Sequence, residues 1–146
     1  MAERKEMAKD PTCNERIDDA LASTVETLEA LLEQERTDPD GYHDEHGNLN
    51  EYGLSFDYKP KDEDNENGYF CFLMSWGGPS DELRFYADLD GDLYKVEYWF
   101  LDWFDGASRT VYLHDGERPD WVVDLWAWFE PSVDHCYREA TQADEY

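Results

Sequence analysis

Residues 82–103 have the sequence ELRFYADLDGDLYKVEYWFLDW. Residues 82–89 alternate along the chain, with Leu83, Phe85, Ala87 and Leu89 on one face and Glu82, Arg84, Tyr86 and Asp88 on the other. This period of two is typical of a strand with one buried face. Asp90-Gly91 follows, a dipeptide favoured in type I′ turns because both central residues need a positive φ. Residues 92–103 return as a second strand, so the stretch predicts a β-hairpin.

Further strands are predicted on both sides of this hairpin, at residues 52–58, 69–76 and 108–114. Residues 69–76 are apolar on both faces, which is typical of a central strand. We expect Asp105-Gly106 to form a second turn. Strands that follow one another through short connections favour antiparallel pairing, so the segments predict a meander.

Helices are predicted at both ends of the meander. Thr12 followed by Glu15 fits a capping box. The apolar residues behind it repeat at helical spacing over residues 13–36: Ile17, Leu21, Val25, Leu28 and Leu32. Pro119 suits the first turn of a second helix, which Pro131 should break or kink.

The predicted fold class is therefore α+β, with an N-terminal helix, an antiparallel five-stranded meander sheet and a C-terminal helix. Both helices can cover one face of the sheet. We expect residues 1–11 to be a flexible tail and residues 12–146 to form a single α+β domain.

Charge is the dominant anomaly of the composition. Twelve Lys and Arg stand against 37 Asp and Glu, a formal net charge of −25, and 16% of the residues are aromatic. A disordered acidic chain would have few aromatic residues, so the chain should fold. A strongly negative surface disfavours nucleic acid and anionic lipid as direct partners, and it favours a basic protein surface through electrostatic steering.

The sequence also indicates a compartment. No stretch approaches the roughly 18–20 apolar residues that span a bilayer, and Met1–Asp10 is too polar for a signal peptide. Cys13, Cys71 and Cys136 are odd in number and far apart, which fits reduced thiols rather than a disulfide framework. We expect a cytoplasmic protein that does not bind a membrane.

No motif predicts catalysis, a cofactor or a metal. Asp88-Leu89-Asp90-Gly91-Asp92 has its glycine at the fourth position, where a calcium-binding EF-hand loop needs it at the sixth, so a hairpin turn is favoured. The histidines of His43-Asp44-Glu45-His46 do not have the spacing of the H-E-x-x-H zinc signature. The nucleophile elbow, the phosphate-binding P-loop and the dinucleotide-binding glycine motif are all absent from the sequence.

Partner binding is instead predicted at acidic clusters on turns and at aromatic residues of residues 94–104. The candidate residues are Asp62, Glu63, Asp64 and Glu66; Asp88, Asp90 and Asp92; Asp102 and Asp105; and Trp99 and Trp103. In a meander the first two clusters lie at the same end of the sheet, so we expect them to form one negative patch. Trp99 and Trp103 would share one strand face, and exposed aromatic residues of this kind are enriched in binding hot spots.

The segments Ser75-Trp-Gly-Gly-Pro-Ser-Asp-Glu82 and Asp102-Trp-Phe-Asp-Gly-Ala107 resemble small accessory proteins of plasmids and phages. In acidity and size the chain also resembles the DNA-mimic inhibitors of such elements, the anti-restriction and anti-CRISPR proteins. This resemblance implies an inhibitor that occupies the nucleic-acid-binding surface of a host defence complex. An ordinary cytosolic protein of a salt-adapted organism and a metal-assisted hydrolase are the alternative hypotheses.

Overall fold

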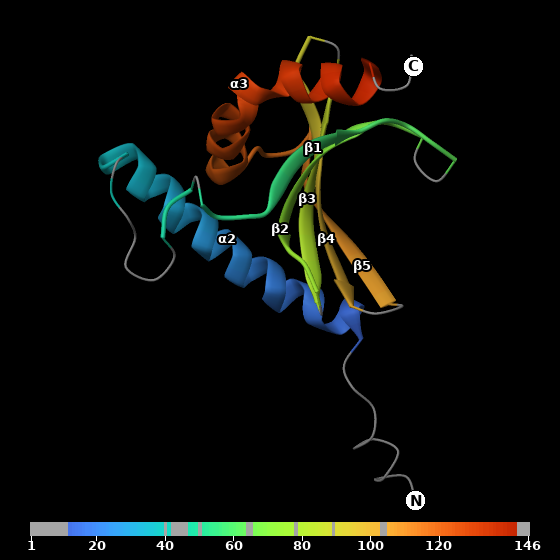
Figure 1. Cartoon of the computed structure of the whole chain (residues 1–146). Coiled ribbons are helices and arrows are strands. Elements are labelled where there is room, and N and C mark those ends of the chain that lie inside the picture. The colour runs from blue at the N-terminus through green and yellow to red at the C-terminus, as the bar shows by residue number, and fades with distance from the viewer. Residues whose placement is uncertain are drawn as a thin grey trace, which may run out of the picture.

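The computed structural model describes residues 12–39, 41, 47–49, 51–63, 66–77, 79–88, 90–102 and 105–142. These residues form the following helices and strands, arranged as in Figure 1: α2 (Cys13–Thr37), β1 (Ser55–Lys59), β2 (Tyr69–Ser75), β3 (Ser80–Ala87), β4 (Leu93–Asp102), β5 (Asp105–Leu113) and α3 (Asp120–Gln142). The strands form one antiparallel sheet in the order β1-β2-β3-β4-β5. The predicted α+β class and the meander are confirmed. The predicted tail, residues 1–11, lies outside the described residues.

The predicted strand boundaries are right to within a few residues, except at two points. The first strand was predicted from Tyr52 but begins at Ser55, because Gly53 has a φ of +82° and turns the chain just before it. The second turn was predicted at Asp105-Gly106, yet both residues belong to β5. Asp102 pairs with Asp105 across the hairpin, so the connection is residues 103–104.

The helix α2 begins with the predicted capping box. The Thr12 side chain accepts the Glu15 amide, and the Glu15 side chain accepts the Thr12 amide in return. These reciprocal bonds satisfy two backbone donors that a helix N-terminus otherwise leaves open. The face turned to the sheet buries Ile17, Leu28, Leu31 and Leu32.

Both helices lie on the same side of the sheet, as Figure 1 shows and as their shared hydrophobic core requires. Inward residues of the middle strands supply the other half of that core: Phe70, Phe72, Leu83, Phe85, Val96, Tyr98 and Phe100. The helix α3 runs through Pro131 without ending, and in Figure 1 its two halves point in different directions. A proline that removes one helical hydrogen bond explains a bend at this point.

A polar cluster is enclosed between α2 and the sheet. The Tyr98 hydroxyl, fully buried, donates to Asp81 Oδ2 at 2.7 Å, and the Ser75 hydroxyl donates to Asp81 Oδ1 at 2.7 Å. Thr24 of α2 donates to the same carboxylate at 3.3 Å. Asp81 thus supplies the acceptors that these hydroxyls need away from water.

Candidate functional site

A groove of about 460 Å³ lies between the β3–β4 connection and α3. Its carboxylates come from both sides, with Asp88, Asp90 and Asp92 on the connection and Glu130 and Asp134 on α3. Aromatic rings line the space between them: Tyr58, Phe70, Trp126 and Tyr137. None of the described residues that line the groove is basic. The groove therefore combines an acidic rim with an aromatic floor.

The β3–β4 connection holds its three carboxylates in a defined arrangement. Asp88 Oδ1 accepts the amides of Asp90 and Asp92 at 2.9 and 3.0 Å, and the Asp88 amide donates to the Asp92 carbonyl at 2.9 Å. Gly91 has the expected positive φ, +88°. The connection nevertheless spans Asp88 to Asp92 rather than the predicted two-residue turn, because the Asp88 side chain itself bridges the backbone.

The aromatic floor is fixed by packing and by a link to this connection. The Trp126 indole donates to the Gly91 carbonyl at 3.4 Å and stacks on Phe85 with ring centroids 5.4 Å apart. Tyr58 contacts Phe70 and Tyr137 with centroids 4.8 and 5.0 Å apart. Burial is the main reason that the pKa of Tyr58 is raised, so this phenol stays uncharged at neutral pH. Sequence reasoning placed Trp126 in a core stripe and missed its contact with the turn.

The three carboxylates of the connection also have the proximity of a cation site. One oxygen from each of Asp88, Asp90 and Asp92 lies within 4.8 Å of the others. All three side chains are exposed, and Asp88 Oδ1 already accepts two amides. The turn explains this arrangement, so we assign no metal to it. The candidate histidines, His43 and His46, lie outside the described residues.

The acidic residues of the β1–β2 connection, Asp62, Glu63 and Glu66, are exposed, and Asp64 lies outside the described residues. The meander places this connection at the same end of the sheet as Asp88–Asp92, as expected. Figure 1 shows the two connections pointing apart, with the green tip of the β1–β2 hairpin well away from the yellow β3–β4 turn. The single negative patch that we expected from the two clusters stays a prediction.

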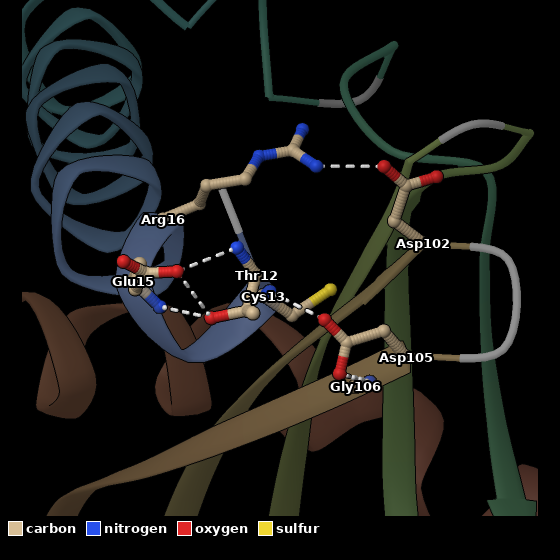
Figure 2. Close-up of polar contacts among 7 residues, drawn as sticks. All are labelled: Thr12, Cys13, Glu15, Arg16, Asp102, Asp105 and Gly106. Atoms are coloured by element: carbon tan, nitrogen blue, oxygen red, sulfur yellow. Dashed lines mark hydrogen bonds and ion pairs between the residues drawn. The ribbon is translucent and has the colours of Figure 1, made fainter. Parts of the chain in front are cut away.

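Asp102 and Asp105 are engaged within the chain. Figure 2 shows that Asp105 Oδ2 accepts the Cys13 amide at 2.6 Å, and Asp102 Oδ2 lies 2.6 Å from an Arg16 guanidinium nitrogen. Asp105 Oδ1 also accepts the Gly106 amide, at 2.9 Å. Both carboxylates thus fasten the N-terminus of α2 to the β4–β5 hairpin, a role that the sequence did not indicate.

Acid is expected to weaken this fastening at Asp105. The hydrogen bond that the Cys13 backbone amide donates to Asp105 is the main reason that the pKa of Asp105 is lowered. A carboxylate with a lowered folded pKa stabilises the fold fully above its unfolded pKa of about 4, and this contribution is lost as the pH falls through the folded pKa. Asp105→Ala should therefore lower the urea midpoint at pH 7, and its difference from the wild type should shrink as the pH falls below about 4.

The control for this measurement is Glu63→Ala, which removes one exposed carboxylate from another connection. The difference in urea midpoint between Glu63→Ala and the wild type should not shrink as the pH falls below about 4, as it should for Asp105→Ala. A stability difference for Asp105→Ala that stays constant from pH 7 into acid would contradict the role given to the Cys13 bond.

Trp99 lies on the sheet face that points away from the helices, and Trp103 lies outside the described residues. The Arg84 guanidinium carbon lies 3.9 Å from the centre of the Trp99 ring, and Arg84 Nε donates to Glu82 at 2.8 Å. The Trp99 indole donates to Glu97 at 3.1 Å. Trp99 is consequently half-covered by its own chain, and buried and half-buried residues alternate from Val96 to Phe100. Tyr94 was expected on the face of Val96 but packs with Tyr69 and Tyr86 on the outer face.

Comparison of the chain with models of known protein families, with curated proteins and with solved structures found no match. Within the described residues, neither helix is long and apolar enough to cross a membrane. The function is therefore inferred from the chemistry of the protein surface.

Proposed function

We propose that this protein binds the basic, nucleic-acid-binding surface of a host defence complex and blocks it, as a folded mimic of nucleic-acid phosphate. The observation that supports this most is the way the chain uses its few cations. Every arginine in the described part of the chain contacts an acceptor within the chain: Arg16, Arg36, Arg84, Arg109, Arg118 and Arg138. The arginines are thus engaged within the chain, where 37 Asp and Glu outnumber all 12 Lys and Arg.

The outward carboxylates are carried by regular structure. Asp19, Glu26 and Glu29 are exposed along α2, and Asp120 and Glu130 are exposed along α3. Duplex DNA presents one charge per about 1.7 Å of its axis, and proteins bind it by neutralising phosphates with Lys and Arg. Carboxylates on rigid helices and a braced turn can meet the same cations with less ordering cost than a flexible acidic tail.

The proposal is tested with nucleic-acid-binding proteins of a bacterial lysate, first enriched on immobilised heparin and then passed over the immobilised protein. Captured proteins should be released by free duplex DNA and by raising the salt from about 0.1 M, where the Debye length is about 10 Å. Proteins that stay bound in excess duplex DNA would contradict mimicry of phosphate.

Two variants locate the binding. Reversing Glu63, Glu66, Asp90 and Asp92 to Lys should abolish capture without unfolding, because surface substitutions cost only about 0.5 kcal/mol each. Asp88 is left in place because it holds the turn. Trp99→Ala keeps the charge and should keep capture. The opposite pattern, loss with Trp99→Ala and retention with the reversed variant, would show an aromatic interface instead.

A further inference from the structure

We infer that the groove between the β3–β4 connection and α3 receives an arginine side chain of the partner. This inference rests on the proposed function in one respect, that the partner surface is basic. A volume of about 460 Å³ falls within the roughly 300–1,000 Å³ usual for ligand sites. It exceeds the size of one guanidinium, so the alkyl stem of the side chain can enter with the charged head.

The carboxylates at the rim of the groove favour a positively charged ligand. Asp90 and Asp92 on the connection and Glu130 on α3 have no ionic partner among the described residues. Asp134 pairs with Arg138 on the same helix at 2.9 Å, but both side chains are well exposed, so this pair is easily exchanged. A positively charged group entering the groove would meet carboxylates from both walls.

The floor selects a guanidinium rather than an ammonium. Tyr58, Trp126 and Tyr137 present aromatic rings to the groove, and Tyr137 is 38% exposed. A planar guanidinium stacks on aromatic faces while its fork of N–H donors binds carboxylates, whereas an ammonium is a compact and strongly hydrated charge. A groove with both components therefore suits arginine better than lysine.

Elsewhere in this chain, an arginine already binds aromatic rings and a carboxylate in this way. On the outer face of the sheet, the Arg84 guanidinium carbon lies 3.9 Å from the Trp99 ring centre and 4.7 Å from that of Tyr69, and Arg84 donates to Glu82. There the chain supplies rings, carboxylate and cation together. The groove presents rings and carboxylates, and the described residues that line it supply no cation.

The experiment uses the whole protein and three blocked pentapeptides that differ at one position, with arginine, lysine or citrulline between glycines. Citrulline keeps the planar shape of arginine but carries no charge. Binding is followed through the ¹H–¹⁵N resonance of the Trp126 indole, whose N–H donates to Gly91 in the floor. We expect the arginine peptide to shift this resonance saturably and to bind at least about tenfold more tightly than the citrulline peptide.

Matched variants separate the groove from the general negative field. Asp92→Asn with Glu130→Gln should reduce arginine-peptide binding by about tenfold or more. Asp19→Asn with Glu26→Gln, on the exposed side of α2, removes the same charge and should leave binding within about twofold, since distant exposed charges are screened. Equal losses in the two variants, or equal affinity for the arginine and lysine peptides, would overturn the inference.

The outcomes also separate this inference from the proposed function. If the arginine peptide binds in the groove but duplex DNA never releases captured proteins, the groove stands and the mimicry fails. If DNA competes for the captured proteins but Asp92→Asn with Glu130→Gln has normal affinity for the arginine peptide, the mimicry stands and the groove inference fails.

Discussion

Phe129→Ala should lower the free energy of unfolding by about 3–5 kcal/mol, the usual cost of deleting a buried aromatic ring. Phe129 is only 8% exposed and joins α3 to the sheet. Its ring stacks on Phe56 with centroids 4.0 Å apart and makes a T-shaped contact with Phe72, with centroids 4.8 Å apart. Removing the ring leaves a cavity between helix and sheet, and urea unfolding followed by circular dichroism measures the loss.

Two control variants show whether the cavity is the cause. Phe129→Leu keeps much of the volume and should cost clearly less, roughly 1–1.5 kcal/mol. Val123→Ala, at a position on α3 that is 41% exposed, should stay within about 0.5 kcal/mol. Similar losses for Phe129→Ala and Val123→Ala would mean that α3 contributes little packing to the core.

Local sequence signals were sufficient for most of the fold. The period-two alternation of residues 82–89, the capping box at Thr12 and the helical apolar spacing behind it each act over a few neighbouring residues. They therefore identify elements and their inward faces without tertiary information. The order of the sheet followed because short connections leave antiparallel neighbours as the main solution.

The position of the second turn depended on tertiary contacts instead. Asp-Gly is a strong turn signal, yet Asp105-Gly106 pairs with Asp102 and Leu101 as the start of β5. In this register Phe100 lies opposite Ala107 on the core side of the sheet. The Asp105 carboxylate also accepts a hydrogen bond from the amide of Cys13 at the N-terminus of α2, 92 residues away. Neither contact is visible in a local pattern.

In the candidate site, too, local sequence signals identified one part and tertiary contacts determine the other. The acidic turn at Asp88–Asp92 was found because its residues are adjacent in the sequence. The floor was missed because Tyr58, Phe70 and Trp126 come from β1, β2 and α3. Helical spacing assigns Trp126 to an inward stripe, but it does not show which turn of the sheet that stripe meets.

Charge alone also failed to separate candidate binding residues from structural ones. Asp102 and Asp90 look alike in the sequence, since each is an aspartate within one residue of the end of a predicted strand. In the structure Asp102 lies 2.6 Å from Arg16, 86 residues earlier, whereas Asp90 is exposed at the rim of the groove. In a chain with 37 Asp and Glu and 12 Lys and Arg, tertiary contacts such as the Arg16 ion pair distinguish the carboxylates that are engaged within the chain from those that are exposed.

Asp81→Ala should cost about 3 kcal/mol of unfolding free energy, although Asp81 is one carboxylate among many on an overcharged chain. It is the acceptor for the Tyr98 and Ser75 hydroxyls at 2.7 Å each. Burial is the main cause that raises the pKa of Tyr98, and Asp81 raises it further, so the phenol stays protonated and remains a donor. Deleting the acceptor leaves a fully buried hydroxyl unsatisfied, at a cost of about 1–3 kcal/mol, in addition to the charged hydrogen bonds that are lost.

A double-mutant cycle with Tyr98→Phe tests this account. Tyr98→Phe alone should cost about 1.5 kcal/mol, and the double variant should be more stable than the sum of the single losses by about 1–2 kcal/mol, because no unsatisfied hydroxyl is left at Tyr98. Asp81→Asn keeps one carbonyl acceptor and should lie between the wild type and Asp81→Ala. Losses that simply add would show that the two side chains stabilise the fold independently. A gain in stability for Asp81→Ala would show that relief of charge repulsion at −25 outweighs the buried hydrogen bonds.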